Sequence, residues 1–402
     1  MTLGIVYHMP FWRDVDGTLR EREGSFARYV DSLAPYFDEI LLCVPVLPQA
    51  DGEGTAIQSS NVTVVPLPPF EGPAQFYPRL AAVLPRLLSW AQRVDVIHCR
   101  LPTPAAIFAF TIGRWLRRPA FVLIVGDLRA LLPSMPYRGL KRFLWRAYTA
   151  FEERNVQWMA DRALTFVNGG ALTDKHSRSG RRVIQTTTTT IHEGDIASRT
   201  DTCATSRVRA LVVSRIDPRK GLRVLPQTVR QVIDAGIDLT VDIVGPTVGA
   251  PGREERSVIV DDARALGVAN RIVFDGAVPL DRLLPMYAAY DLFVLPTLPG
   301  EGIPRVLLEA MSGGLPIVTT RTAGIPGLVQ HDVNGLLVDE PSPEHIAGAI
   351  QTLIRDGTRR RRLIANGYAT ARLHTLEAQA ASMMAVVSNE LHLTLRAAPA
   401  IG

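Results

Sequence analysis

Residues 291–314 read DLFVLPTLPGEGIPRVLLEAMSGG, and this stretch indicates the fold class. The apolar run Leu292–Leu295 is typical of a buried strand. The run Val306–Met311, followed by two glycines, is typical of a helix that reaches its stop signal. Pro304 fits the first turn of this helix, which places Glu309 on the second turn. A strand joined to a helix by a Gly- and Pro-rich loop predicts an α/β unit with a parallel sheet.

Two carboxylates, Glu301 and Glu309, flank the start of this helix. Glu301 falls in the loop at the carboxyl end of the strand, where ligands bind in open α/β sheets. The N-terminus of a helix at such a place attracts anions. Ionised carboxylates only accept hydrogen bonds and therefore suit a ligand rich in hydroxyls. A sugar nucleotide has both hydroxyls and phosphates, so the segment predicts a site for this class of ligand.

The composition is that of a globular protein with two domains. The chain has 402 residues, of which 47% are hydrophobic and 21% charged. This length predicts two domains. We expect a strand rather than a secretory leader at the N-terminus, and no segment long enough to span a bilayer. The scattered Cys43, Cys99 and Cys203 show no disulfide or metal-ligand spacing, so we expect buried thiols at Cys43 and Cys99 and a reducing, cytoplasmic location.

The net charge of +5 is unevenly distributed along the chain. Eight basic residues lie between positions 114 and 146, and only Asp127 opposes them, so this stretch is +7 and the rest of the chain is slightly acidic. The eight are Arg114, Arg117, Arg118, Arg129, Arg138, Lys141, Arg142 and Arg146. Such a patch predicts an anionic partner. No nucleic-acid-binding motif accompanies it, so nucleic acid is not expected as that partner.

Strand-like and helix-like segments alternate twice along the chain, which predicts two parallel α/β sheets. The strands expected in the first half are Leu3–Tyr7, Glu39–Val46, Val62–Leu67, Val94–Cys99, Ala120–Val125 and Ala163–Val167. Those expected in the second half are Arg209–Val213, Thr240–Val244, Arg271–Phe274, Leu292–Leu295, Pro316–Thr319 and Gly335–Val338. Helices are expected between them, among them Leu222–Ala235, whose Pro226 predicts a later start, and Glu255–Leu266.

These patterns predict four parts of the chain. Residues 1–190 form a Rossmann-like N-terminal domain, and the polar stretch 191–206 is an interdomain linker. Residues 207–372 form a second Rossmann-like domain. Residues 373–402 form a C-terminal helix that packs back toward the N-terminal domain.

A basic loop follows the first strand of the second half. It reads SRIDPRKG over residues 214–221 and places Arg215 and Lys220 between a strand and a helix. Arg binds phosphate oxygens bidentately and Lys acts as a point charge, so the two can straddle a diphosphate. A solvated basic loop is the alternative, but Glu301 and Glu309 at the same sheet edge favour phosphate binding.

The second half of the chain resembles the retaining glycosyltransferases of family 4, which have the GT-B fold. The resemblance covers almost all of 207–355 in the expected order and is strongly specific as a set. Its motifs are Val213-Ser214-Arg215 with Lys220-Gly221, Val241–Gly245, Arg271–Val278, Tyr290–Pro296, Glu301–Glu309, Gly313–Val318 and Asn334–Val338.

The resemblance implies two Rossmann-like domains with parallel sheets facing across a cleft, and it implies a role for each matching residue. Arg215 and Lys220 would neutralise the leaving diphosphate, which is a catalytic role. Glu301 would contact hydroxyls of the donor sugar, and Glu309 would hold the ribose. The remaining donor contacts would come from Gly276, Val278, Gly302, Ile303 and Pro304, and from Gly24 and Ser25 of the N-terminal domain. Neither a metal nor any other cofactor is expected.

Two departures from the family pattern concern the sugar. Many members carry a His in the loop after the strand that matches Ala120–Val125, where this chain has Gly126-Asp127. Asp127 either takes that polar, catalytic role or leaves it absent. Pro304 stands where many members have Gly, and it has no N–H to offer the sugar.

The acceptor is expected to bind the N-terminal domain, with His98, Arg100, Arg138 and Arg142 as candidates. For His98, a hydrogen-bonded histidine at a strand end is an equally good interpretation. Around Arg138 and Arg142, a stripe of Leu140, Phe143, Leu144, Ala147 and Phe151 at helical spacing leaves two alternatives. One is a helix with this stripe facing the core, and the other is contact with an anionic acceptor or membrane surface.

These residues predict an enzyme that moves a sugar from a nucleotide-diphosphate donor to an acceptor hydroxyl with retention of anomeric configuration. The acceptor would be a glycan, a lipid-linked molecule or a small molecule, and the enzyme would lie free in the cytoplasm or on the inner face of the membrane. A catalytically degenerate nucleotide-sugar-binding regulator or scaffold remains an alternative, and a sugar-nucleotide epimerase is a third.

Overall fold

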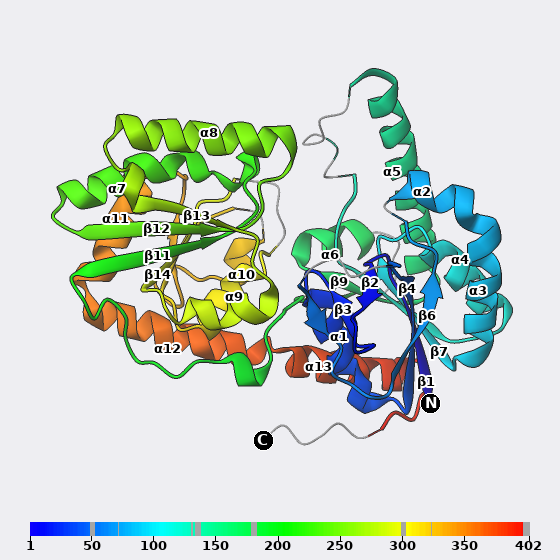
Figure 1. Cartoon of the computed structure of the whole chain (residues 1–402). Helices are drawn as coiled ribbons and strands as arrows, with labels where there is room; N and C mark the ends of the chain where they lie inside the picture. Colours follow the sequence, from blue (N-terminus) through cyan, green and yellow to red (C-terminus); the bar gives the residue numbers. More distant parts are fainter. Residues whose placement is uncertain are drawn as a thin grey trace. The chain divides into compact units, whose positions relative to one another are not determined.

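The computed structural model contains two compact α/β units, formed by residues 1–188 with 376–402 and by residues 189–375 (Figure 1). The structure describes the chain except for residues 49–52, 71, 130–131, 133–137, 178–182, 299–302, 323 and 397–402. Glu301 and Gly302 therefore lie outside the described residues. The segment 191–206 belongs to the second unit.

The first unit contains a seven-stranded parallel sheet of order β10-β9-β8-β7-β1-β4-β6. The strands are β1 (Thr2–Val6), β4 (Glu39–Pro45), β6 (Val62–Leu67), β7 (Val96–Leu101), β8 (Ala120–Ile124), β9 (Leu164–Asn168) and β10 (Val183–Thr186). Six match the expected runs, and β10, a short and partly exposed edge strand, is additional. The order of the strands reverses between the neighbouring strands β1 and β7: β4 and β6 follow β1 toward one edge of the sheet, and β8, β9 and β10 follow β7 toward the other.

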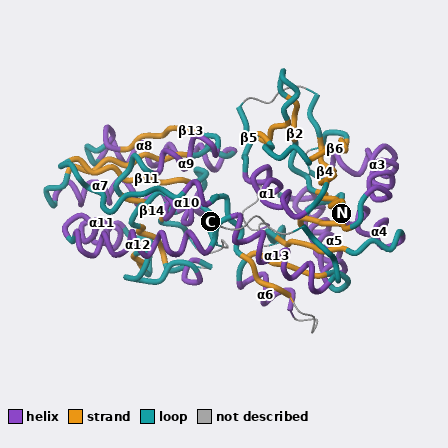
Figure 2. Tube along the Cα trace, turned by 90° about the horizontal axis from the view of Figure 1, so that it is seen from below, coloured by secondary structure: helices purple, strands orange, loops and turns teal. Residues whose placement is uncertain are grey.

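Successive residues of a strand face opposite sides of the sheet, and each side of the first sheet is covered by helices. On β4, Ile40 and Leu42 join one core, whereas Leu41 and Cys43 join the other. The first core is completed by α1 (Ser25–Leu33) and α13 (Leu376–Glu390). The second is covered by α3 (Leu80–Arg93) and α4 (Ala106–Trp115), which lie side by side (Figure 2), and by α5 (Gly139–Ala160). Cys43 and Cys99 are buried thiols, as predicted.

The second unit contains a six-stranded parallel sheet of order β13-β12-β11-β14-β15-β16. The strands are β11 (Arg207–Val213), β12 (Asp238–Val244), β13 (Ile272–Gly276), β14 (Leu292–Leu295), β15 (Ile317–Thr320) and β16 (Leu336–Val338). The helices are α7 (Leu225–Asp234), α8 (Gly249–Ala265), α9 (Leu280–Tyr287), α10 (Val306–Ser312), α11 (Pro343–Arg355) and α12 (Gly357–Leu373). Helices α7, α8 and α11 pack on one face, and α9 and α10 on the other.

Helix boundaries and small elements differ from the sequence predictions in a few places. Pro226 lies in the first turn of α7, so the helix begins at Leu225 as its proline required. Helix α8 begins at Gly249, six residues before the predicted start, because Pro251 is tolerated in a first turn. The antiparallel sheet of β2 (Phe11–Arg13), β3 (Leu19–Glu21) and β5 (Thr55–Ala56) was not predicted, since each strand is only two or three residues long.

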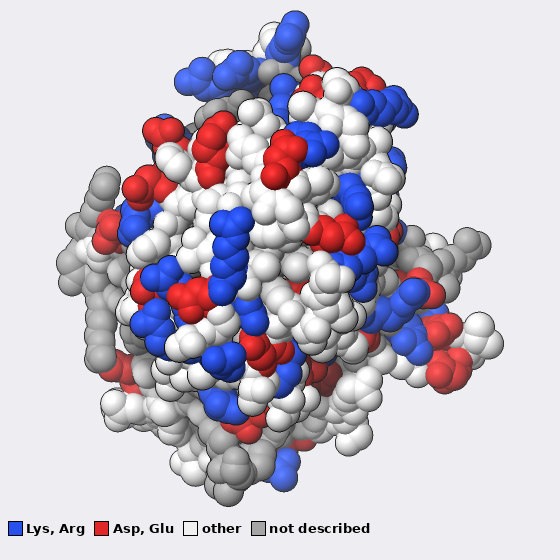
Figure 3. Space-filling model, turned by 90° about the vertical axis from the view of Figure 1, so that its left-hand side faces the viewer, with Lys and Arg blue, Asp and Glu red and all other residues white. Residues whose placement is uncertain are grey.

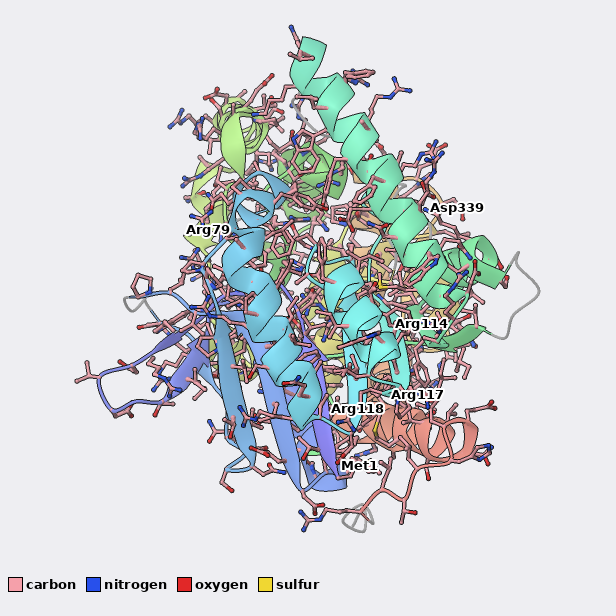
Figure 4. All side chains as sticks on the ribbon, turned by 90° about the vertical axis from the view of Figure 1, so that its right-hand side faces the viewer. Met1, Arg79, Arg114, Arg117, Arg118 and Asp339 are labelled. Carbon is pink, nitrogen blue, oxygen red and sulfur yellow. The ribbon has the colours of Figure 1, made fainter. Side chains whose placement is uncertain are left out.

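The basic stretch does not form one patch. Arg114, Arg117 and Arg118 lie at the end of α4, close to the start of β8, whereas α5 begins beyond the opposite edge of the sheet (Figure 4). Arg129 pairs with Glu153 at 2.8 Å. The prediction of a single patch is therefore wrong, because β8 separates its two ends. Figure 3 looks onto the second unit instead, and there positive and negative side chains are interspersed.

The apolar stripe of α5 is exposed, which contradicts the core-facing alternative. Leu140, Phe143, Leu144 and Phe151 retain 73%, 66%, 57% and 49% of their accessible surface. The first turns of α5 project beyond the sheet of their own unit (Figure 1), so only later residues such as Val156 and Met159 reach the core. Among the residues that the structure describes, no helix has both the length and the apolar content to cross a membrane.

Candidate functional site

The candidate site lies at the carboxyl edge of the second sheet, between β11 and β14. These strands are neighbours, yet β12 and β13 continue from β11 on one side and β15 and β16 from β14 on the other. The order of the strands thus reverses between β11 and β14, and ligands bind at such switch points in open α/β sheets. The loop after β11 carries Arg215 and Lys220, and the loop after β14 leads to α10 and Glu309.

Hydrogen bonds and a close backbone approach hold these two loops together. The N–H of Leu298 donates to the carbonyl of Arg219 at 2.8 Å, and the Thr297 hydroxyl donates to the same oxygen at 3.3 Å. Gly221 has a φ of 64°, and a Cβ there would lie 2.1 Å from the carbonyl oxygen of Pro296. Only glycine fits this position, so the sequence itself sets the spacing between the basic loop and the loop that precedes Glu309.

Arg215 and Lys220 belong to the same short loop. The Arg215 side chain is exposed, and Lys220 is buried at the end of a 3-10 turn, η6 (Pro218–Lys220). Asp217 fixes the turn because it accepts from the Arg219 backbone N–H at 3.0 Å and from the Arg219 guanidinium at 2.9 and 2.8 Å. These bonds, chiefly those from the guanidinium, lower the pKa of Asp217 to about 2.

Glu309 is a buried carboxylate with a hydrogen-bond donor on each oxygen. Its side chain is 4% exposed. The Thr190 hydroxyl donates to Oε1 at 2.6 Å, and the Tyr287 hydroxyl donates to Oε2 at 2.7 Å. Burial, and then Glu309 itself, raise the pKa of Tyr287, so this hydroxyl remains a donor.

The start of α10 differs from the sequence prediction. The helix begins at Val306, as the predicted run does, but Pro304 lies before the first turn, and Glu309 lies in that turn rather than in the second. Pro304 instead precedes the N-cap residue Arg305, and its carbonyl accepts the N–H of Leu307 at 3.1 Å. The correction moves Glu309 closer to the N-terminus of α10, where the partial positive charge of the helix stabilises a carboxylate.

Thr190 and Tyr287 are functional candidates that sequence analysis did not identify. They lie 119 and 22 residues from Glu309 along the chain. Thr190 ends a run of five threonines, Thr186–Thr190, and Tyr287 is the last residue of α9. The need of a buried Glu for partners was a signal that such donors exist, but it did not say where.

The other predicted donor residues of this unit lie around the same edge. Gly276 ends β13 with a φ of 72°, and its carbonyl accepts the N–H of Gly245 from the loop after β12. Val278 and Ile303 are partly buried against the core that contains α10. Glu301 and Gly302 lie in the undescribed segment between β14 and Ile303, so their contacts remain predictions.

Gly24 and Ser25 open α1 in the first unit. Gly24 is the N-cap residue with a φ of 75°, and Ser25 is buried. Glu21 Oε2 accepts the N–H groups of both Phe26 and Ala27 at 2.9 Å. This carboxylate, which the sequence analysis missed, already occupies part of the anion-binding position at the start of α1.

His98 is completely buried in β7. Its Nε2 lies 3.0 Å from the Tyr29 hydroxyl, and its ring stacks on Phe121 at 4.3 Å between centroids. Burial lowers the pKa of His98 to about 3. These contacts favour the alternative interpretation, a neutral histidine satisfied within the core, over direct contact with an acceptor.

The other acceptor candidates have different surroundings. Arg138 and Arg142 are exposed at the start of α5. Arg100 is buried at the carboxyl end of β7, with its guanidinium carbon 4.6 Å from the centre of the Tyr29 ring. These three cations therefore do not form one site.

Asp127 is held by an ion-pair network. Its carboxylate accepts from Lys175 Nζ at 2.8 Å, and Lys175 also contacts Glu153 at 2.7 Å. The backbone N–H of Arg129 donates to the other carboxylate oxygen at 2.9 Å. Asp127 thus already has a cationic partner, which favours the alternative that the polar role of the family His is absent.

No group of three or more His, Cys, Asp or Glu side chains is placed to hold a metal ion in the part of the chain that the structure describes. Arg215 and Lys220 are the residues of the second unit whose chemistry suits phosphate binding.

Comparison with known families agrees with this geometry. Residues 203–370, which include both loops and α10, match the family described as Glycosyl transferases group 1. The second unit contains a glycosyl transferases group 1 domain. Within this group 1 domain lie the candidate residues Arg215, Lys220 and Glu309.

Two curated relatives each match less than half of the chain. A GDP-mannose-dependent alpha-(1-6)-phosphatidylinositol monomannoside mannosyltransferase of Mycobacterium tuberculosis is 33% identical over 163 residues, 38% of this chain and 40% of that protein. A D-inositol 3-phosphate glycosyltransferase of Corynebacterium glutamicum is 32% identical over 181 residues, 44% of this chain and 43% of that protein. The chain thus spans less than half the length of the curated relatives that it matches.

A solved structure resembles nearly the whole chain, including the first unit. HepE from Anabaena, in complex with UDP and glucose, aligns with a TM-score of 0.67 at 21% identity, covering 96% of this chain and 99% of that one. This likeness and the two parallel sheets confirm the predicted α/β, GT-B fold.

Proposed function

We propose that this protein is a retaining glycosyltransferase that uses a nucleotide-diphosphate sugar. The observation that carries the proposal is the arrangement at the switch point of the group 1 domain. There Glu309 is held as an acceptor of hydrogen bonds, and the basic loop with Arg215 and Lys220 is hydrogen-bonded to the loop that leads to it. A ligand with both vicinal hydroxyls and a diphosphate fits this pairing.

In this proposal each side chain acts on a different part of the donor. Glu309, fixed by Thr190 and Tyr287, accepts hydrogen bonds from the ribose hydroxyls. Arg215 and Lys220 stabilise the negative charge that grows on the diphosphate as it leaves. Glu301 and the adjacent backbone contact the donor sugar. Gly276 and Val278 border the base.

The transfer breaks the bond between the anomeric carbon and the diphosphate oxygen, and it forms a bond from that carbon to the acceptor oxygen. The proton of the acceptor hydroxyl passes to the leaving diphosphate. No enzyme nucleophile is required in this scheme. Neither a metal nor another cofactor is part of it.

We infer that the acceptor is a hydroxyl of a glycan, a lipid-linked molecule or a small molecule. The names of the two relatives, with a phosphatidylinositol mannoside and an inositol phosphate, support acceptors of this kind. Both acceptors carry a phosphate as well as hydroxyls.

Helix α5 supports peripheral contact with an anionic membrane. Leu140, Phe143 and Leu144 are exposed beside Arg138, Lys141, Arg142 and Arg146 on its first turns. Apolar side chains that enter the membrane interface and cations that attract anionic lipid headgroups together give such binding.

Co-sedimentation with vesicles tests this contact. The protein should sediment with phosphatidylglycerol vesicles, and much less of it should sediment with neutral phosphatidylcholine vesicles. Equal recovery of wild type and the double variant F143S/L144S from the anionic vesicles would contradict this role of α5.

One observation favours a second function, that of a nucleotide-sugar-binding regulator without transfer. Asp127 is already paired with Lys175, so the residue in place of the family His has no evident role toward the sugar. Release of free nucleoside diphosphate from a panel of nucleotide sugars separates the two functions. The enzyme should release it, faster with an acceptor present, whereas a regulator should bind the donor and release none.

A further inference from the structure

The first unit has its own switch point, between β1 and β7. These neighbouring strands continue toward opposite edges of the sheet, β1 to β4 and β7 to β8. His8 follows β1, Arg100 lies near the end of β7, and Thr103 comes three residues later. As in the second unit, a switch point is where a ligand is expected in an open α/β sheet.

Arg100 is a buried cation with unsatisfied donors. Its side chain is 7% exposed. The guanidinium carbon lies 5.2, 5.4 and 4.6 Å from the ring centres of Tyr7, Phe26 and Tyr29. Its Nε and Nη1 atoms have no hydrogen-bond partner among the residues that the structure describes. Aromatic rings stabilise the charge but do not accept these N–H groups as a carboxylate or phosphate would.

Other polar atoms of the same region are also unsatisfied. His8 Nδ1, Glu21 Oε1 and Thr103 Oγ1 are buried without a hydrogen-bond partner in the described part of the chain. Burial, and then the charge of Arg100, lower the pKa of His8 to about 4, so its ring is neutral near pH 7. Burial raises the pKa of Glu21, and the other oxygen of its carboxyl group caps α1. Each such group would cost stability if nothing ever satisfied it.

We propose that Arg100 binds the anionic group of the acceptor substrate, a phosphate monoester or a carboxylate, at the β1–β7 switch point. The unsatisfied Nε and Nη1 atoms donate N–H groups that the oxygens of such a group can accept. Thr103 and His8 supply further polar contacts, and Glu21 Oε1 accepts from a hydroxyl of the same molecule. This inference rests on the proposed function and narrows its acceptor to an anionic, hydroxyl-bearing molecule.

The charge balance assigns the anion to the acceptor rather than to the donor. Arg100 supplies a single positive charge, and the carboxylate of Glu21 beside it would repel a strongly charged diphosphate. The donor diphosphate has its own cations in Arg215 and Lys220 of the group 1 domain. A singly or doubly charged acceptor group is the better match for one guanidinium.

The binding test uses inorganic phosphate as the probe. Calorimetric titration is carried out with the group 1 domain saturated by nucleoside diphosphate, so that Arg215 and Lys220 are already engaged. Wild type should bind one phosphate per chain, and Arg100→Gln should bind at least about tenfold more weakly. Arg162→Gln is the matched control, because Arg162 also stacks on an aromatic ring, that of Trp158 at 4.8 Å, but lies outside the switch point. Absence of saturable phosphate binding by wild type, or equal binding by Arg100→Gln, would overturn the proposal.

The kinetic test separates the acceptor from the donor as the source of the anion. Glycerol is compared with glycerol phosphate, and inositol with inositol phosphate, as acceptors. Wild type should prefer the phosphorylated partner, and Arg100→Gln should lose that preference by about ten- to a hundredfold, while the donor KM stays unchanged. Arg100→Lys, which keeps the charge but has fewer N–H donors, should lie between them and serves if the glutamine variant does not fold. A raised donor KM with unchanged acceptor preference would assign the anion to the donor and overturn the proposal. Absence of nucleoside diphosphate release by wild type would instead count against the proposed function, while the phosphate titration still reports on Arg100.

Discussion

The two switch points share a topology but differ in how their charged groups are satisfied. In the second unit, each oxygen of the buried Glu309 accepts a hydroxyl, from Thr190 and from Tyr287. In the first unit, Arg100 is equally well buried, yet its Nε and Nη1 have no partner within the described residues. The second site is already organised before a ligand arrives, whereas the first retains donors for a ligand to satisfy. Topology alone therefore locates a candidate site, and the hydrogen bonds that its charged groups already make indicate which ligand chemistry suits it.

The largest expected effect is on turnover at the second unit. Glu309→Ala should lower donor turnover by between about 10-fold and about 20,000-fold, because it removes one or two charge-assisted hydrogen bonds of roughly 1.5–3 kcal/mol each. The measurement is release of nucleoside diphosphate under initial-rate conditions. Glu340→Ala, an exposed carboxylate of the same unit, is the matched control and should retain the wild-type rate. An unchanged rate in Glu309→Ala would remove this residue from the site.

The next effect concerns the support of Glu309. Tyr287→Phe deletes one hydroxyl that holds the carboxylate and should raise the donor KM by roughly two- to tenfold, since a hydrogen bond contributes about 0.5–1.5 kcal/mol. The value of kcat should change less than KM, because the hydroxyl positions the ribose contact and not the reacting atoms. Equal loss of kcat with an unchanged KM would show that Tyr287 acts on the chemical step instead.

Substitutions at the two sites should change the free energy of unfolding differently. Arg100→Met replaces a buried, incompletely paired charge by an apolar side chain and should leave the free energy of unfolding unchanged or raise it by about 1–3 kcal/mol. Glu309→Ala should lower it by a similar amount, because Thr190 and Tyr287 lose their acceptor. Thermal or urea unfolding of both variants measures the difference. Destabilisation by Arg100→Met as large as that by Glu309→Ala would erase the contrast between the sites.

The smallest expected effect is a pH-dependent change in the free energy of unfolding, which tests how Asp217 stabilises the basic loop. Asp217 has a pKa of about 2 in the folded protein, below its ordinary 3.8, because Arg219 donates to its ionised form. Its contribution, about 1–2 kcal/mol, is therefore present above pH 3.8 and disappears as pH falls toward 2. Asp217→Asn should destabilise the protein by this amount at pH 7, and the difference from wild type should shrink below pH 4. A difference that stays constant from pH 7 to pH 2 would show that the carboxylate charge is not what stabilises the loop.

Sequence analysis was most successful where a residue type is required by local geometry. Strand runs, the Gly stop after α10 and the basic loop closed by Gly221 all follow from neighbours in the chain, and the structure has each of them. Glu309 was identified by its place near the start of a helix that follows a buried strand, but without its partners. Those partners, Thr190 and Tyr287, depend on how distant segments meet, which spacing along the chain does not reveal.

The failures have the same physical origin. The stripe from Leu140 to Phe151 has the spacing of a core-facing helix. Its burial depends on whether the sheet extends as far as the first turns of α5, and it does not. The basic stretch between Arg114 and Arg146 is continuous in sequence, yet β8 carries its two ends to opposite edges of the sheet. The unsatisfied state of Arg100 could not be predicted either, since it depends on atoms that are absent from its surroundings rather than on its neighbours in the chain.

Binding of nucleotide sugars, measured by thermal shift, tests the central claim most directly. At a concentration one hundred times its dissociation constant, the correct donor should stabilise wild type by about 2.7 kcal/mol. Glu309→Ala should lose most of this stabilisation, and Arg100→Gln should keep it, because the donor site belongs to the group 1 domain. Stabilisation by no nucleotide sugar, or equal stabilisation of wild type and Glu309→Ala, would contradict the account.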